Sequence, residues 1–188
     1  MHRFATLAAA TLALAASFGA HAVTVSVTQN DQWYAFDIDD QAFPNFGTGW
    51  IDTGANFGEA LSFSFILNTP TYLRVIDAGH AGDRFNVSID NRGGITTLAT
   101  GAAVDSFPAG TGDYDTAWAN SNYSRLNTLL APGSYFVTGD LLQAAGGGGA
   151  PLNVTTGALM LTAVPEPGIW AMLFAGLGLI GSIVRRRA

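Results

Sequence analysis

The chain has 188 residues, a formal net charge of −6 and no cysteine. The lack of cysteine excludes a disulfide framework, a thiolate nucleophile and a cysteine zinc site. All eight basic residues are arginine, and the segment 23–163 holds only four of them against thirteen acidic residues. Such a segment repels nucleic acid and acidic lipid, because it has no cations to displace their counterions.

Residues 1–22 have the pattern of a secretory signal peptide. Arg3 supplies a positive charge, and the apolar stretch FATLAAATLALAASFGA follows it. The small residues Ala20 and Ala22 then stand at the two positions that signal peptidase reads. Because the stretch ends in a cleavage signature and not in a stop-transfer pattern, we predict export and a mature chain that begins near Val23.

Residues 23–163 predict a single all-β domain. Apolar residues alternate with polar ones in seven stretches rich in β-branched and aromatic residues, each bounded by turn-forming residues. The stretches are Val23–Gln29, Trp33–Ile38, Leu61–Leu67, Thr71–Asp77, Arg84–Asp90, Ser134–Leu142 and Gly157–Val164. No window shows helical spacing with caps. We therefore expect one antiparallel β-sandwich or jelly roll, which a segment of this length is large enough to form around one core.

The composition of two connections between these strands predicts their structure. APGS at Ala131–Ser134 places proline and glycine between two apolar runs, which favours a hairpin. AAGGGGAP at Ala144–Pro151 is too rich in glycine to pack, so we expect a mobile loop before the last strand.

The aspartates in FDIDDQA are candidate metal ligands. On one strand Asp37 and Asp39 project from the same face, about 7 Å apart, and Asp40 follows directly. Clustered carboxylates can hold calcium, although the stretch does not fit an EF-hand loop because Ala42 stands where the glycine is needed. We expect structural roles for these residues and keep a calcium site, or a glycosidase carboxylate pair, as alternatives.

Residues with catalytic chemistry are few. His80 is the one histidine of the predicted mature chain, and no Gly-x-Ser-x-Gly elbow occurs. It lies in DAGHAGD between two predicted strands, so we expect a loop histidine. Asp77, Asp83 and Asp90 around it are expected to end strands and to cap turns. No enzymatic activity is therefore predicted.

Three tryptophans could serve a sugar-binding protein. Trp33, Trp50 and Trp118 would make a stacking surface if they lay exposed on one side of the domain. Burial in the sandwich core is the interpretation we favour.

The C-terminal segment, residues 164–188, predicts a membrane stop. The uncharged run 168–184 has 17 residues and, as a helix, spans about 25 Å, close to the hydrocarbon thickness of a bilayer. Arg185, Arg186 and Arg187 would stay in the cytoplasm. The run contains GLGLIG, but no strand precedes this glycine motif, so we reject a nucleotide site. We predict a transmembrane helix.

The link before this helix is VPEP. Pro165 and Pro167 cannot continue a helix or a strand, and each favours extended backbone in the residue before it. An extended link just outside the membrane is a suitable protease substrate.

This order of VPEP, apolar helix and terminal arginines resembles the PEP-CTERM sorting signal, whose module is also catalogued as the ice-binding protein C-terminal domain. The resemblance implies that Pro165, Glu166 and Pro167 are recognised by a membrane-embedded cysteine protease, the exosortase. It also implies a Gram-negative, polysaccharide-producing host, with this protein as a substrate of the machinery. YLRVIDAGHAGDRFNV further resembles the FxDxA subgroup of such proteins, although no strict Phe-x-Asp-x-Ala occurs in the chain.

The sequence thus predicts three parts: a signal peptide at 1–22, a β-sandwich ectodomain at 23–163 and a sorting signal at 164–188. We expect a non-enzymatic protein without a cofactor, processed by signal peptidase and exosortase. It would be anchored transiently in the inner membrane and then reach the cell surface or biofilm matrix, where exopolysaccharide is a candidate partner. A calcium-assisted carbohydrate-binding module is the first alternative, and a secreted glycoside hydrolase is the second.

Overall fold

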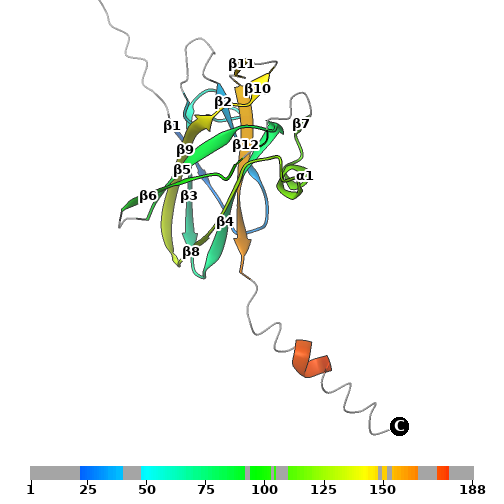
Figure 1. Ribbon diagram of the computed structural model, residues 1–188. Helices are drawn as coiled ribbons and strands as arrows, with labels where there is room; N and C mark the ends of the chain where they lie inside the picture. Colours follow the sequence, from blue (N-terminus) through cyan, green and yellow to red (C-terminus); the bar gives the residue numbers. More distant parts are fainter. Residues whose placement is uncertain are drawn as a thin grey trace, which may run out of the picture.

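The computed structural model describes residues 22–39, 48–91, 94–102, 104, 110–147, 150–151, 154–164 and 173–177. Most of them form two β-sheets that face each other, as Figure 1 shows. The elements are β1 (Ala22–Ser26), β2 (Tyr34–Asp39), β3 (Ala60–Leu67), β4 (Thr71–His80), β5 (Arg84–Asp90), β6 (Ile95–Ala99), β7 (Gly110–Thr111), α1 (Tyr114–Ala119), β8 (Arg125–Leu130), β9 (Gly133–Gln143), β10 (Gly146–Gly147), β11 (Ala150–Pro151) and β12 (Val154–Ala163).

The first sheet has the strand order β1-β3-β9-β5-β6. Its central strands pair antiparallel, but β1 pairs with β3 in parallel, with Val25 opposite Phe63. In the second sheet the order is β2-β12-β4, and β4 pairs along its other edge with both β8 and β7. In β5 of the first sheet alternate residues are buried, as expected for a sheet that packs on one side, whereas β4 and β12 of the second sheet have continuous buried runs.

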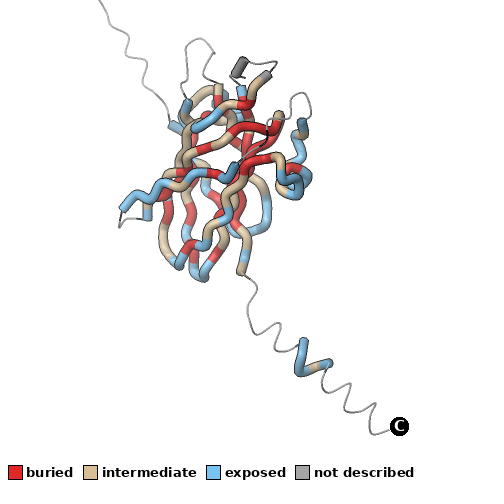
Figure 2. The backbone as a smooth tube through the Cα atoms, viewed as in Figure 1, coloured by how far each residue is buried: buried red, intermediate tan, exposed pale blue. Residues whose placement is uncertain are grey.

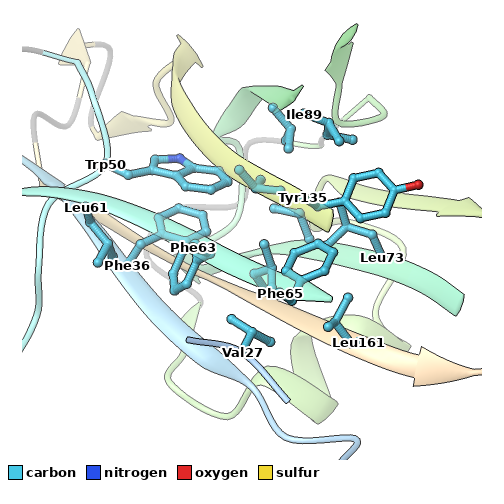
Figure 3. Packing of buried hydrophobic residues seen from close by; sticks show 14 of the residues in the cluster. Val27, Phe36, Trp50, Leu61, Phe63, Phe65, Leu73, Ile89, Tyr135 and Leu161 are labelled. Carbon is cyan, nitrogen blue, oxygen red and sulfur yellow. The ribbon is translucent and has the colours of Figure 1, made fainter. Parts of the chain in front are cut away.

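The core lies between the two sheets, where both contribute large apolar side chains (Figures 2 and 3). Phe63, Val87 and Val137 come from the first sheet, and Leu73 and Leu159 come from the second. Each of these five side chains is at most 1% exposed. Burial of this kind stabilises a sandwich by about 1.5–3 kcal/mol for each large apolar side chain.

A short segment around Trp50 joins the two sheets at one end. The Trp50 amide donates to the Gly139 carbonyl of β9, while Ile51 exchanges both backbone hydrogen bonds with Asp37 of β2. The Trp50 ring stacks on Phe36, with centroids 4.0 Å apart and planes at 14° (Figure 3). This segment therefore holds the sheets together through both backbone and side chain.

Two strand glycines make room for this aromatic stack. A Cβ atom on Gly139 would lie 2.2 Å from Cε2 of Trp50, and one on Gly157 would lie 2.4 Å from Cζ of Phe36. Glycine inside a strand is otherwise unfavourable, so close approach of the rings accounts for both positions.

Helix α1 covers part of the outer face of the second sheet. Asp113 caps it by accepting hydrogen bonds from the amides of Asp115 and Thr116. The buried Ala117 packs with a small second core that includes Ile76 and Ala158. A helix of six residues is not stable alone, so this packing and the cap maintain it.

The seven predicted strands are confirmed, with ends that differ by a few residues. Three expectations were wrong. β1 runs parallel to its neighbour, α1 is a capped helix where none was expected, and APGS joins β8 of the second sheet to β9 of the first and makes no hairpin. The glycine-rich segment contains a short ladder of β10 and β11. The shorter strands β6, β7 and β8 were missed as well.

Gly139→Ala should destabilise the fold by about 1–3 kcal/mol. The added methyl group overlaps the Trp50 ring, and it also lies too close to neighbouring backbone, which cannot move aside. Urea denaturation of the purified protein measures the change. Gly112→Ala is the matched control, since a Cβ there meets nothing within 4 Å. Equal stabilities of the two variants would show that the Trp50 ring is not held against β9 in solution.

Candidate functional site

The predicted processing residues come before and after the domain in the sequence. Ala20, the PEP residues Pro165, Glu166 and Pro167, and Arg185, Arg186 and Arg187 are outside the described residues. Ala22 is the first residue of β1, and β12 ends at Ala163, directly before the predicted sorting signal (Figure 1). Within the described residues, no helix has the length and apolar character needed to cross a membrane.

The predicted mature N-terminus, Val23, lies inside β1. Its carbonyl accepts a hydrogen bond from the Ser62 hydroxyl at 3.1 Å, and its backbone pairs in register with Leu61. The first residues after the expected cleavage position are thus part of the first sheet.

Of the candidate calcium ligands, Asp37 and Asp39 alternate along β2 with the buried Phe36 and Ile38, as expected. They therefore project away from the core, on the outer face of the second sheet. Burial raises the pKa of Asp37, and a hydrogen bond with Thr156 opposes that rise. Asp40 lies outside the described residues, and within those residues no group of three or more acidic, histidine or cysteine side chains could hold a metal ion.

The three tryptophans do not share one surface. Trp50 is 2% exposed in the main core, whereas Trp33 and Trp118 are half-buried around α1, with ring centroids 5.8 Å apart. The Trp33 indole N–H donates to Asp115 on α1 at 2.8 Å. The expected burial is confirmed for Trp50, and the other two rings attach the helix to the sheet.

Two arginines complete this attachment. The guanidinium groups of Arg74 and Arg125 lie 5.0 Å and 5.9 Å from the centroid of the Trp118 ring. Arg125 also donates to the Trp118 carbonyl near the end of α1. Cation–π contacts and a charge-assisted hydrogen bond favour this position of the helix.

The turn DAGHAGD contains a pair of buried carboxylates that we call the buried acidic pair, Asp77 and Asp83. They are 0% and 2% exposed. Asp83, directly before β5, accepts hydrogen bonds from the Ala145 amide and the Thr155 hydroxyl, so it connects the start of β5 to the segments before and within β12. Asp77 accepts one from the Gly82 amide at 3.2 Å, and its other oxygen has no hydrogen-bond partner.

The rest of this turn is fixed by backbone geometry. Gly79 and Gly82 have positive φ angles of 73° and 137°, which favour glycine. The Tyr123 hydroxyl donates to the Gly79 carbonyl at 3.0 Å, and His80 is the half-buried last residue of β4. His80 thus ends a strand and does not lie in an open loop.

The buried acidic pair has an unusual protonation state. Burial raises the pKa of Asp77 to about 9, and the charge of Asp83 contributes to that rise. The Asp77 carboxyl group is therefore neutral at pH 7 in the folded protein. The sequence predicted turn-capping aspartates here. The one sign that the two carboxylates would lie near each other was their position on either side of a glycine-containing turn.

These features define the class of protein. It has an all-β domain of two packed sheets, followed in the sequence by a C-terminal signal. Residues 163–188 match the model of the PEP-CTERM protein-sorting motif, so the chain carries this sorting signal. Among solved structures, the chain is similar to the pre-peptidase C-terminal domain of a collagenase from Bacillus anthracis. The identity is 9%, the match covers 75% of this chain and 94% of that one, and the TM-score is 0.39. None of the curated proteins matches the chain.

Stability should fall as pH rises through the range from about 4 to about 9, because the folded state keeps the proton on Asp77 that the unfolded chain has lost. The slope from this single proton is at most about 1.4 kcal/mol per pH unit. Asp77→Asn, which mimics the protonated carboxyl, should remove this slope. Urea denaturation at pH 5 and pH 8 measures it.

Asp113→Asn is the matched control for this test. Backbone hydrogen bonds from Thr116 and Asp115 lower the pKa of Asp113, so its titration lies below this range, and asparagine also caps helices. An unchanged slope in Asp77→Asn would mean that Asp77 is ionised in the folded protein.

Proposed function

We propose that the protein is an exported, non-enzymatic component of the cell surface or extracellular matrix, released there when exosortase processes its C-terminal signal. One observation carries this proposal, the match of residues 163–188 to the PEP-CTERM protein-sorting motif. That motif makes the chain an exosortase-sorted exported protein. The β domain that precedes this motif in the chain is the part of the protein that sorting delivers to the cell surface.

The physical order of the tail supports processing at the PEP residues. The last strand ends at Ala163, so the link begins where the folded domain stops. Pro165 and Pro167 then favour extended backbone, which proteases generally bind. The run 168–184 and the three arginines behind it form the proposed temporary stop in the inner membrane.

The burial of the acidic pair argues against these two carboxylates as a glycosidase pair. Two carboxylates that act on a glycosidic bond must both reach a substrate and water. Asp77 and Asp83 are close enough to influence each other but are 0% and 2% exposed. Their hydrogen bonds to the amides of Gly82 and Ala145 are those of residues that hold a turn.

The protein released by the native host should begin near Val23 and end between residues 164 and 167. Signal peptidase would remove the first segment, and exosortase would cut at the PEP residues. Intact mass spectrometry of the culture medium and the membrane fraction measures both ends. A released protein that still contains Arg187 would contradict exosortase processing.

Replacement of the three sorting residues (Pro165→Ala, Glu166→Ala and Pro167→Ala) should leave the protein in the inner membrane, because the helix and arginines remain while the cleavage motif is lost. Membrane fractionation and immunoblotting measure the fraction of the protein that stays in the inner membrane. This fraction should rise from a minor to the major part of the total protein. Pro132→Ala, at an exposed turn between β8 and β9, is the control and should be released normally.

Carbohydrate binding is the second candidate function. A groove of about 540 Å³ over β1, β3 and β9 favours it, and this groove lies on the opposite sheet from Asp37 and Asp39. The calcium-assisted form of this function depends instead on Asp37, Asp39 and Asp40. A rise in melting temperature with calcium over EDTA, lost in Asp39→Asn, would favour the calcium form.

A further inference from the structure

The groove lies on the outer face of the first sheet, over β1, β3, β9 and the end of β5. The inward residues Phe65 and Tyr135 belong to the core, so the residues next to them on each strand face outward. The outward side chains that line the groove are Ser26, Ser64, Ile66, Asp90, Ser134 and Phe136. Its volume is within the range of small-ligand pockets in proteins.

Apolar and hydroxyl side chains alternate in this groove. Ile66 pairs in register with Ser134, and Phe136 pairs with Ser64, so each apolar side chain lies opposite a serine. Ile66 is 75% exposed and Phe136 is 44% exposed. A sugar ring has C–H groups on its faces and hydroxyls around its edge. A surface with neighbouring apolar and hydroxyl groups fits both parts of such a ring.

Hydroxyl side chains continue across the sheet beyond the groove. Thr24 and Ser62 contact each other at 2.9 Å, and Ser88 and Thr97 do so at 3.3 Å. Thr138 of β9 is the register partner of Ser88. Ser62 is itself only 5% exposed, so a ligand longer than the groove would meet the hydroxyls of Thr24, Thr97 and Thr138.

The charge of the groove and of the surrounding domain restricts the class of ligand. Among the described residues that line the groove, Asp90 is the one charged residue and none is basic. The segment 23–163 has nine more acidic than basic residues. An anionic polymer would be repelled by this surface, and a cationic polymer would find one carboxylate among the described residues of the groove.

We infer that this groove binds an uncharged polysaccharide, with Phe136 packed against the face of a sugar ring and Ser64 and Ser134 bonded to its hydroxyls. The inference deepens the second candidate function and needs no calcium. It rests on export of the domain to where such polymers lie, but not on exosortase cleavage, because the groove is made by the folded sheet alone.

Native affinity electrophoresis of the full-length protein in mild detergent tests the inference. Gels containing hydroxyethyl cellulose or galactomannan, which are uncharged, should retard the protein. Gels containing alginate, which is anionic, should not. No retardation by either uncharged polymer, or equal retardation by alginate, would overturn the inference.

Phe136→Ser should weaken retardation about tenfold, because it removes the aromatic contact with the sugar. Leu142→Ser is the matched control, since Leu142 lies on the same strand, is 45% exposed and does not line the groove. Ile66→Ser, at the most exposed apolar position of the groove, should weaken retardation in the same direction. Thermal melting shows whether each variant folds.

Equal retardation of Phe136→Ser and Leu142→Ser would overturn the inference. So would a change in sedimentation of Phe136→Ser without loss of retardation, because the face would then be an interface between copies of this chain. The mass of the released protein is measured separately. Failure of sorting and failure of sugar binding are therefore distinguishable.

Discussion

Trp50 lies in the segment that joins the two sheets, and the fold depends on the space left for its ring. The ring stacks on Phe36, and both rings lie over strand positions where only glycine fits, Gly139 and Gly157. The same segment bonds to β9 through the Trp50 amide and to β2 through Ile51. Because side-chain packing and backbone pairing meet here, the relative position of the two sheets follows from this contact.

The two outer faces of the sandwich differ from each other. Helix α1, with Trp33, Trp118 and two arginines, covers part of the second sheet. The outer face of the first sheet has the groove with Phe136 and the neighbouring hydroxyls of β1, β3, β5 and β6. The face proposed for a ligand therefore belongs to the first sheet, whereas the aspartates first considered for calcium, Asp37 and Asp39, lie on the second.

Local pattern predicted the long strands because alternation of apolar and polar residues is a property of each strand alone. It missed β6 and β8, whose sequences ITTLA and RLNTLL are short and do not alternate clearly. β6 is largely exposed and β8 is partly buried, and pairing with β5 and β4 maintains them. It missed α1 because the groups that stabilise this helix lie outside it: Ile76 and Ala158, on which Ala117 packs, together with Trp33 and the two arginines. The parallel pairing of β1 depends on a partner far along the chain, which no local window contains.

The sequence alone determined the all-β class and the sorting signal at residues 163–188, because strand periodicity is local and a sorting motif is read as a linear segment. Tertiary structure decided which of the candidate residues came together. Asp77 and Asp83 became a buried pair, Trp50 entered the core while Trp33 and Trp118 held a helix, and Phe136 stayed exposed beside a row of hydroxyls. These outcomes depend on which strands become neighbours and which face each one buries, and both are set by contacts between distant parts of the chain.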